Sequence, residues 1–196
     1  MKSGNDYKQS QLKKNLNKEM SKKKLGIIGG GQLGSMLSEA AKKLEIKTTV
    51  YCDDQDGPAQ NFCDEFIFGS YKDNEKILEF ANKVDVITYE FENIPFETLN
   101  EMNKLKTVLP KPSVNRLIQH RLAEKDFINK LNIRTTRYVS IEKKSDIETL
   151  EDFLPGILKT TTMGYDGKGQ YPIKKIDDLN LIDIDFSKGY ILEKLV

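Results

Sequence analysis

A glycine- and lysine-rich stretch in the last quarter of the chain has the composition of a loop that could hold a polyphosphate. Residues 160–170 read Thr-Thr-Thr-Met-Gly-Tyr-Asp-Gly-Lys-Gly-Gln and follow the short apolar run Gly156–Lys159. Glycine backbone can approach phosphate oxygens closely, its N–H groups can line an anion nest, and Lys159 and Lys168 supply counter-charge. A β-hairpin turn is the alternative, because Asp-Gly is a common hairpin signal.

A second glycine cluster, Gly29-x-Gly31-x-x-Gly34, stands between the apolar run 25–28 and a helical pattern. The spacing fits the dinucleotide fingerprint, and Asp53 or Asp54 lies near the distance expected of a ribose-binding acid. Taken alone, this cluster would predict an NAD-dependent oxidoreductase. The same turn also suits any anion at a helix N-terminus, or serves only a tight connection between strand and helix.

Two glutamates follow the apolar run 84–89, in the sequence Thr88–Pro95 (Thr-Tyr-Glu-Phe-Glu-Asn-Ile-Pro). If that run is a parallel strand, Glu90 lies at the carboxyl edge of the sheet, where open α/β sheets bind ligands. A carboxylate there can accept hydrogen bonds from a ribose diol. Alternatively, Glu90 and Glu92 are first-turn acids that favour the dipole of the next helix.

Strand and helix patterns alternate over residues 24–112, which predicts a parallel, doubly wound α/β layer. The expected strands are 25–28, 48–52, 65–68, 84–89 and 107–109. Helices are expected near 73–82 and 95–103, and a first helix follows the glycine cluster. That first helix carries one apolar stripe at helical spacing, made of Leu33, Met36, Leu37, Ala40, Ala41 and Leu44.

Pro110 and Pro112 interrupt both patterns, so we place a domain boundary there and a second, α+β domain over residues 113–196. Ser113 can cap a helix, and the helix 121–131 is expected to bury Leu122, Phe127, Ile128 and Leu131. Strands are expected at 138–140, 156–159, 170–174 and 190–194, with a helix at 146–153. The sequence stops inside the last strand, so we expect this domain to be incomplete.

Composition narrows the classes of protein. The chain has 196 residues, 38% hydrophobic and 31% charged, with no apolar run that approaches a membrane span and no secretory segment. Cys52 and Cys63 have no metal-ligand spacing, so we expect reduced thiols and a cytoplasmic location. His120, the single histidine, lies in a predicted helix without partners for catalysis, and no metal ligands are expected in this chain.

The N-terminal segment is strongly basic. Met1–Lys24 holds eight lysines against Asp6 and Glu19, with Tyr7 as its one aromatic residue and no arginine. Nucleic-acid binding normally uses arginine and stacked aromatic rings. We therefore expect residues 1–23 to be a disordered extension, and we expect neither nucleic acid nor a membrane as a partner.

Three motifs together resemble those of the ATP-grasp superfamily, and within it the 5-(carboxyamino)imidazole ribonucleotide synthetase family. They are Gly-Gln-Leu-Gly at 31–34, Tyr-Glu-Phe-Glu-Asn at 89–93 and Gly-Tyr-Asp-Gly-Lys-Gly-Gln at 164–170. The resemblance covers residues 24–196 in the expected order. It implies a Rossmann-like pre-ATP-grasp domain over 24–112, followed by the first part of an ATP-grasp domain over 113–196.

The resemblance also implies an activity. It is the ATP-dependent carboxylation of aminoimidazole ribonucleotide with bicarbonate in purine biosynthesis, giving ADP and phosphate through carboxyphosphate. ATP and Mg²⁺ are the implied cofactors, and a homodimer is an implied assembly. In that family the acidic magnesium ligands and the residues for the substrate phosphate lie beyond the part that this sequence matches. We therefore expect no turnover by the chain as given.

The family's functional residues carry over position by position. Lys159 and Asp166 would be catalytic, with Lys159 on the ATP phosphates and Asp166 orienting the attacking amine, while Tyr165 packs on the imidazole. Glu193 and its neighbours would read adenine. The implied nucleotide site is Arg121, Lys159, Gly164, Tyr165, Asp166, Gly167, Lys168, Gly169, Gln170, Glu193, Lys194, Leu195 and Val196. The implied substrate site is Gly31, Gln32, Leu33, Glu90, Tyr165 and Asp166.

Other interpretations stay open at this point. A phosphoribosylglycinamide-type ligase or formyltransferase shares ATP and the ribonucleotide scaffold, but usually carries Glu where Gln32 stands. An NAD-binding oxidoreductase depends on the Gly29–Gly34 turn alone. A non-catalytic nucleotide-binding fragment is the third alternative. Arg121 also has an alternative as an exposed helix arginine paired with Glu124.

Overall fold

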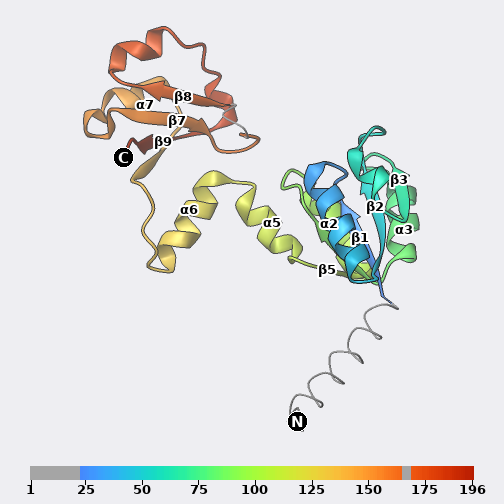
Figure 1. Ribbon diagram of the computed structural model, residues 1–196. Coiled ribbons are helices and arrows are strands. Elements are labelled where there is room, and N and C mark those ends of the chain that lie inside the picture. Colours follow the sequence, from blue (N-terminus) through green and yellow to red (C-terminus); the bar gives the residue numbers. More distant parts are fainter. Residues whose placement is uncertain (1–22, 165–168) are drawn as a thin grey trace, which may run out of the picture. The chain divides into compact units, whose positions relative to one another are not determined.

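The computed structural model describes residues 23–164 and 169–196, and the chain divides into two compact units between Asn115 and Arg116 (Figure 1). Most of the basic extension predicted over 1–23 lies outside the described residues, so that expectation stays a prediction. Among the helices that the structure describes, none is long and apolar enough to cross a membrane.

The first unit contains a five-stranded parallel sheet with the order β3-β2-β1-β4-β5. Its strands are β1 (Lys24–Ile28), β2 (Lys47–Cys52), β3 (Glu65–Phe68), β4 (Val86–Tyr89) and β5 (Thr107–Val108). The parallel layer predicted from the alternating patterns is therefore confirmed. The predicted strand at 84–89 begins two residues later, at Val86.

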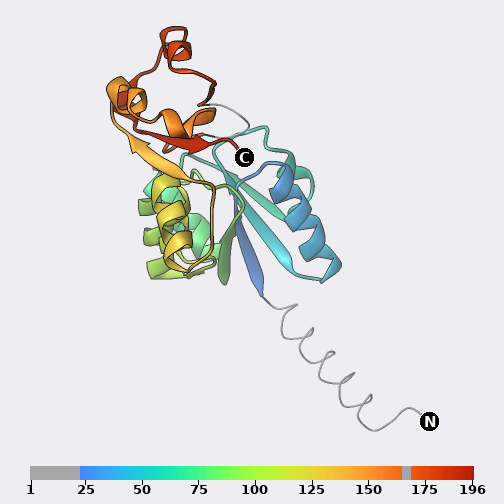
Figure 2. The same cartoon turned by 90° about the vertical axis from the view of Figure 1, so that its left-hand side faces the viewer.

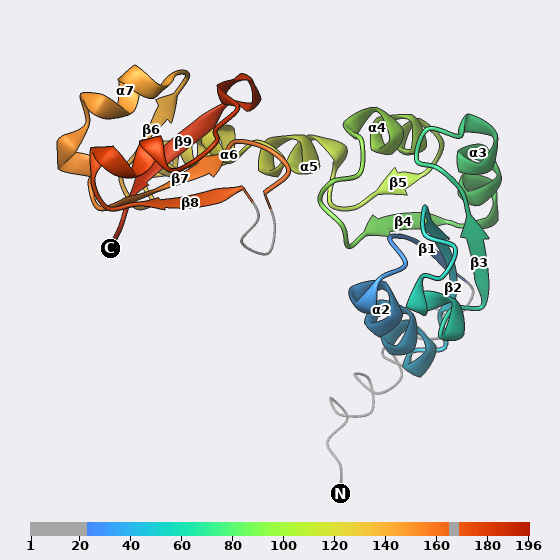
Figure 3. The ribbon, with the colours of Figure 1, turned by 90° about the horizontal axis from the view of Figure 1, so that it is seen from above.

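Helices cover both faces of this sheet, as expected of a doubly wound layer (Figures 2 and 3). They are α2 (Gln32–Lys43), α3 (Asn74–Lys83) and α4 (Phe96–Leu105), with a 3-10 turn η1 (Pro58–Asn61). In Figure 3, α2 lies on one side of the strands, and α3 and α4 lie on the other. The Asp73 carboxylate caps α3 by accepting a hydrogen bond from the Lys76 N–H at 3.1 Å.

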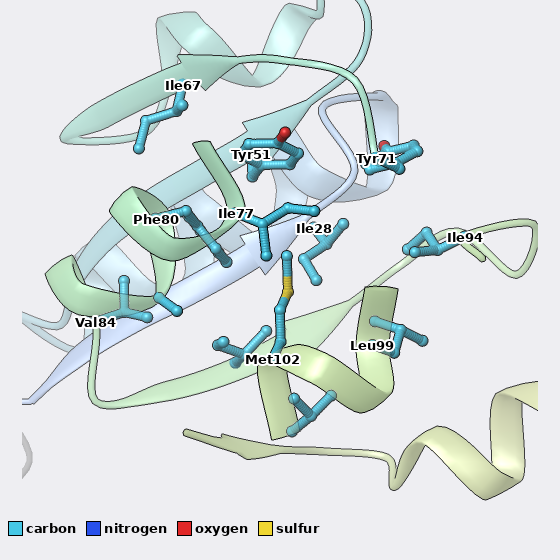
Figure 4. Close-up of a cluster of buried hydrophobic side chains, with 13 residues drawn as sticks. Ile28, Tyr51, Ile67, Tyr71, Ile77, Phe80, Val84, Ile94, Leu99 and Met102 are labelled. Atoms are coloured by element: carbon cyan, nitrogen blue, oxygen red, sulfur yellow. The ribbon is translucent and has the colours of Figure 1, made fainter. Parts of the chain in front are cut away.

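Successive strand residues serve opposite faces, so the sheet has two cores. The larger cluster lies on the α3 and α4 side, where Ile28, Tyr51 and Ile87 pack with Phe80 and Met102 (Figure 4). The ring centroids of Tyr51 and Phe80 are 5.5 Å apart. On the α2 side, Ile27 and Val50 pack with Ala59 of η1 in a smaller cluster.

The apolar stripe of α2 is largely exposed. Leu33, Met36 and Leu44 keep more than half of their surface in solvent, and the buried positions of the helix are instead Gly34, Ser35, Ser38 and Ala41. The physical reason is the short distance between α2 and the backbone that follows β1. A Cβ on Gly34 would overlap the Gly29 carbonyl oxygen, so the helix lies too close to the sheet for a large side chain between them.

The second unit contains a four-stranded antiparallel sheet with the order β6-β9-β7-β8. Its strands are β6 (Tyr138–Ile141), β7 (Gly156–Thr160), β8 (Gln170–Ile173) and β9 (Tyr190–Lys194). Its other elements are α6 (Arg121–Lys130), α7 (Lys144–Glu148) and the 3-10 turns η2 (Glu151–Phe153), η3 (Ile176–Asn180) and η4 (Phe186–Lys188). This α+β architecture confirms the predicted class.

One face of this second sheet is apolar. Leu158 of β7, Leu192 of β9 and Ile173 of β8 pack with Ile147 of α7 and Phe153 of η2. Because side chains alternate along a strand, residues 159 and 193 belong to the opposite face. That face carries Lys159 and Glu193, which form an ion pair.

Four local expectations about this second half of the chain are wrong. The helix expected at 146–153 is broken into α7 and η2. Ser113 lies inside α5 (Pro112–Ile118) instead of capping it. His120 is the N-cap of α6, where its Nδ1 accepts the Ala123 N–H at 3.4 Å. None of the ten residues of α6, all of them described, is buried. Leu122 and Ile128 are only half-buried, and Phe127 and Leu131 are exposed, so the predicted apolar side is not buried as a whole.

Gly34→Ala should destabilise the first unit by about 1–3 kcal/mol, the usual range for overpacking against a rigid neighbour. The added methyl group would meet the Gly29 backbone oxygen, which cannot rotate away. Without that clash, alanine would stabilise a helix by about 0.8–1 kcal/mol relative to glycine. The change in stability therefore has opposite signs with and without the clash. Thermal denaturation followed by circular dichroism measures the change, with Lys42→Ala on the exposed side of α2 as the control. A higher melting temperature for Gly34→Ala would contradict this packing.

Candidate functional site

The glycine turn and Glu90 meet at the point where the strand order of the first unit reverses. The chain adds β2 and β3 on one side of β1, then crosses to add β4 and β5 on the other side. The β1–β4 junction is therefore the switch point, where open α/β sheets bind ligands at their carboxyl ends. Ile28 is paired with Tyr89 there, and the Glu90 N–H donates to the Ile28 carbonyl at 3.1 Å.

The Glu90 side chain lies over the glycines that follow β1. A Cβ on Gly29 would lie 2.5 Å from Glu90 Oε1, and one on Gly31 would lie 3.4 Å from the same oxygen. Gly29 also has a φ of +108°, which side-chain-bearing residues rarely adopt. The Gly31 N–H donates a hydrogen bond to the Glu90 carboxylate. The start of α2 thus already faces an anion that belongs to the protein itself.

This arrangement weighs against two of the alternatives drawn from the sequence. A dinucleotide pyrophosphate at the Gly29–Gly34 turn would meet the Glu90 carboxylate, and like charges repel. The helix α4 starts at Phe96, and the acid in its first turn is Glu97. Glu90 and Glu92 therefore precede the helix and do not serve as its first-turn acids. Gln32 and Leu33, which begin α2, are exposed beside this edge.

Burial sets the electrostatics of Glu90. Desolvation raises the pKa of this carboxyl above its ordinary value, the hydrogen bond from Gly31 opposes that effect, and the charge of Glu92 adds to it. A carboxylate that is only partly compensated in this way gains from further hydrogen-bond donors. A ligand with hydroxyl groups could supply them.

In the second unit, one buried carboxylate joins two lysines on the polar face of the sheet. Glu193 Oε2 accepts a hydrogen bond from Lys159 Nζ at 2.7 Å, and Glu193 Oε1 lies 3.2 Å from Lys125 Nζ. Glu193 is opposite Ile157 in the β7–β9 register, so Lys159 is its diagonal neighbour on the same face. All three side chains are largely buried, with 8%, 17% and 13% exposure for Glu193, Lys159 and Lys125.

The two lysines determine the charge state of Glu193. Burial by itself would raise its pKa, but the hydrogen bonds from Lys159 and Lys125 outweigh burial and hold the pKa below the usual range. Lys125 has a further contact, because its ammonium group lies 5.3 Å from the centroid of the Tyr138 ring. The cluster carries one negative and two positive charges, which leaves an excess of positive charge on this face.

Arg121 holds the chain that leads into the glycine-rich loop. Its Nε donates to the Thr160 carbonyl at 3.2 Å, and its guanidinium also donates to the Gly164 carbonyl at 3.1 Å. The Arg121 N–H donates to the Thr161 carbonyl at 2.8 Å. Arg121 therefore faces the loop, in contrast to the exposed arginine of the alternative interpretation.

The described ends of the loop show that it closes a hairpin. Lys159 of β7 is paired with Gln170 of β8, and the Thr160 N–H donates to the Gly169 carbonyl at 2.9 Å. Gly169 has a φ of +67°, and a Cβ there would lie 2.6 Å from Thr160 Oγ1. The glycine-rich segment therefore connects the two strands of a hairpin, which is compatible both with a simple turn and with a phosphate-binding loop. Residues 165–168 lie outside the described residues, so the roles expected of Tyr165, Asp166, Gly167 and Lys168 stay predictions.

The segment expected to read adenine already has several internal partners. The Lys194 N–H donates to the Arg137 carbonyl at 2.9 Å, and the Lys194 carbonyl accepts from Thr136 Oγ1 at 2.8 Å. The Leu195 N–H donates to the Pro155 carbonyl at 3.0 Å. Leu195 and Val196 are exposed. The adenine contact expected of Glu193–Val196 stays a prediction.

Sequence reasoning missed Lys125 as a member of this cluster. Lys125 follows Arg121 by one helical turn, and residues at i and i+4 share a helix face. That spacing was the available signal. It could not have identified Glu193 as the partner, because the two residues meet only through the packing of α6 against the sheet.

The remaining candidate chemistry is limited. In residues 23–164 and 169–196, no group of three or more His, Cys, Asp or Glu side chains could hold a metal ion. Cys52 is buried, Cys63 is half-buried, both are free thiols, and burial raises the pKa of each.

The stability that Glu90 confers should depend on pH in a defined direction. Because its folded pKa is raised above the usual value of 4.5, the folded chain holds this proton more tightly than the unfolded chain. The test compares the free energy of unfolding of the wild type with that of Glu90→Gln. The wild-type value minus the variant value should fall as pH rises from 4.5 through the pKa that Glu90 has in the folded chain. Urea denaturation between pH 4.5 and 7 measures this difference, with the exposed Glu97→Gln as control. A difference that rises with pH would contradict the burial argument.

Comparison with known proteins agrees with this division of the chain. A family model described as the ribonucleotide synthetase preATP-grasp domain matches residues 22–119, and an ATP-grasp domain model matches residues 126–196. The N5-carboxyaminoimidazole ribonucleotide synthase of Staphylococcus haemolyticus is 36% identical over 167 residues. That match covers 84% of this chain and 45% of the relative, so the chain spans less than half of the relative's length.

Solved structures show the same similarity. N5-carboxyaminoimidazole synthetase from Staphylococcus aureus, complexed with ADP, superposes with a TM-score of 0.81 at 33% identity, over 89% of this chain and 48% of that one. The Aspergillus clavatus synthase, in complex with ADP and 5-aminoimidazole ribonucleotide, gives 0.75 at 26% identity, over 89% and 46%. The chain therefore belongs to the ribonucleotide synthetase preATP-grasp family, joined to ATP-grasp sequence as in the N5-carboxyaminoimidazole ribonucleotide synthases.

Proposed function

We propose that this protein serves the ATP-dependent carboxylation of 5-aminoimidazole ribonucleotide in purine biosynthesis. The first unit would bind the ribonucleotide and the second unit the ATP phosphates. The observation that carries the proposal is the polar face of the second sheet, where Lys159 and Arg121 stand at the start of the glycine-rich loop. The complexes of the similar synthases with ADP and with 5-aminoimidazole ribonucleotide support both ligands.

On the nucleotide side, the described residues supply charge and position. Lys159 precedes the loop by one residue and would place its ammonium group against the phosphates. Arg121 donates to the Thr160 and Gly164 carbonyls and so holds the described start of the loop. Phosphoryl transfer depends mainly on such positioning and charge neutralisation.

The chemistry of the proposal proceeds in two steps. Bicarbonate attacks the γ-phosphate of ATP, which forms carboxyphosphate and releases ADP. Carboxyphosphate then releases phosphate and delivers CO₂ to the exocyclic amine of the ribonucleotide. Asp166 remains our candidate to orient that amine, and Tyr165 to pack on the imidazole. Magnesium belongs to the proposal through the resemblance, although the described residues provide no carboxylate cluster for it.

On the ribonucleotide side, Glu90 would accept hydrogen bonds from the ribose hydroxyls at the switch point. Gly31, Gln32 and Leu33 would form the adjoining wall. Donors from a diol would relieve the partial desolvation that now raises the pKa of Glu90. Bicarbonate as co-substrate, a homodimer and a cytoplasmic location remain predictions that belong to the same proposal.

Lys159→Met should weaken ATP binding at least tenfold, on the order of the 1.5–3 kcal/mol that a hydrogen bond to a charged group contributes. Isothermal titration calorimetry with ATP measures the dissociation constant. Lys174→Met is the matched control, since Lys174 is an exposed lysine at the end of β8 in the same unit. Equal affinities for the wild type and Lys159→Met would exclude Lys159 from the nucleotide site.

Glu90→Gln should weaken binding of 5-aminoimidazole ribonucleotide by about 1.5–3 kcal/mol and leave ATP binding unchanged, because one charged acceptor of the ribose is lost. Parallel titrations with the two ligands test this selectivity, with Glu97→Gln as the control. Phosphoribosylglycinamide serves as the competing ribonucleotide. Tighter binding of that compound than of 5-aminoimidazole ribonucleotide would favour the glycinamide-type ligase instead, and equal loss of both ligands in Glu90→Gln would make Glu90 structural.

A further inference from the structure

The Glu193 carboxylate has one more lysine partner than charge balance requires. Lys159 and Lys125 each approach a different carboxylate oxygen, at 2.7 and 3.2 Å. One ammonium group would already neutralise the carboxylate. The second lysine comes from α6, and its side chain is 13% exposed although no residue of that helix is fully buried.

We propose that Lys125 is a positioning residue that keeps Glu193 neutralised, so that Lys159 can leave the carboxylate and bind a nucleotide phosphate. This inference rests on the proposed function, because it takes the polar face of the second sheet as the phosphate site. Lys125 itself does not touch the nucleotide. It acts through Glu193 on the availability of Lys159.

The contacts distinguish a fixed lysine from an exchangeable one. Lys125 lies between Glu193 and the ring of Tyr138, whose hydroxyl donates to Asp126 at 2.6 Å and accepts from Asn129 Nδ2 at 3.0 Å. Lys125 is thus fixed among groups of α6 and β6. For Lys159, the only ion pair or hydrogen bond of the side chain among the described residues is the one to Glu193. Lys159 also lies in β7 on the polar face that the proposal takes as the phosphate site, so of these two lysines it is the one placed to meet a phosphate.

A buried carboxylate is the reason why the exchange needs Lys125. Glu193 is 6% exposed, and removing one partner from a buried ion pair leaves a charge that water cannot reach. If Lys159 were the only partner, phosphate binding would have to overcome both the ion pair and the desolvated charge left behind. With Lys125 in place, the carboxylate stays paired after Lys159 leaves. The net positive charge of the cluster also favours the arrival of an anion.

A double-mutant cycle on ATP affinity tests this exchange. The variants are Lys125→Met, Lys125→Arg, Glu193→Gln and Lys125→Met/Glu193→Gln, each titrated with ATP by calorimetry. We expect Lys125→Met to raise the dissociation constant about tenfold, the size of a charged-group penalty of roughly 1.4 kcal/mol. Lys125→Arg, which keeps the charge, should stay within about threefold of the wild type on the same scale. In the Glu193→Gln background, Lys125→Met should have almost no effect, because Lys159 is then already free.

A direct contact between Lys125 and phosphate gives a different result. In that case Lys125→Met would weaken ATP binding equally in both backgrounds, and the inference would be overturned. No effect of Lys125→Met in either background would overturn it as well. If the wild-type chain binds no ATP in these titrations, the proposed function fails and the inference falls with it. If instead the wild type binds ATP and Lys125→Met binds it equally well, only the inference about Lys125 fails and the proposed function stands.

Thermal denaturation without nucleotide tests the shared carboxylate independently. Lys125→Met and Lys159→Met should each lower the melting temperature only slightly, because the other lysine still pairs with Glu193. The double variant should lose several times the sum of the single losses, and Glu193→Gln should remove this excess. Additive losses in the wild-type background would show that Glu193 is not shared, and the inference would fail even if ATP binds.

Discussion

The buried Glu193 carboxylate is the constraint on which the second unit depends. It lies on the central strand pair of the sheet, where solvent cannot stabilise its charge, so the surrounding elements must provide cations. Lys159 comes from β7 and Lys125 from α6, and their two contacts tie a helix and two strands together at one point. Lys125 and Arg121 of α6 are half-buried like the apolar residues Leu122 and Ile128 of the same helix, whereas Phe127 is exposed. The ion pair of Lys125 and the hydrogen bonds of Arg121 thus connect α6 to the sheet and to the chain that follows β7.

The first unit depends on a comparable arrangement, in which a carboxylate faces the start of a helix. Glu90 lies over Gly29 and Gly31 and accepts the Gly31 N–H. The two carboxylates differ in how far neighbouring donors and cations compensate for the burial of their charge. Glu193 has two cations and a lowered pKa, whereas Glu90 has one backbone donor and a raised pKa. A well-paired carboxylate suits a structural or positioning role, and a poorly paired one at a switch point suits a ligand. The two glutamates thus differ in the direction of their pKa shifts because their surroundings differ.

The glycines explain how these side chains reach their places. Gly34 lets α2 approach the backbone at Gly29 so closely that only small residues fit between helix and sheet. The large apolar residues of α2 consequently point outward, and serine hydroxyls turn inward to bond their own helix, as Ser38 Oγ does with the Gly34 carbonyl at 2.9 Å. Gly169 has the same role at the hairpin of the second unit, where a positive φ and the nearby Thr160 exclude a side chain. At Gly34 the neighbour that excludes a side chain is backbone, whereas at Gly169 it is the side chain of Thr160 together with the positive φ.

The sequence by itself determined the order and class of the elements, because period-2 and period-3.6 patterns and turn glycines act over a few residues. It also determined the family, since three motifs occur together in one order. Only the tertiary structure decided which face of α2 is buried, which residues cap the helices, and which side chains surround Glu193 and Glu90. Those outcomes depend on which segments, far apart in the sequence, come close together in the fold. Lys159 and Glu193, for example, meet although 34 positions separate them in the chain. Local periodicity contains no information about such distances, because strand pairing and the separation of helix from sheet are set by the packing of the whole unit.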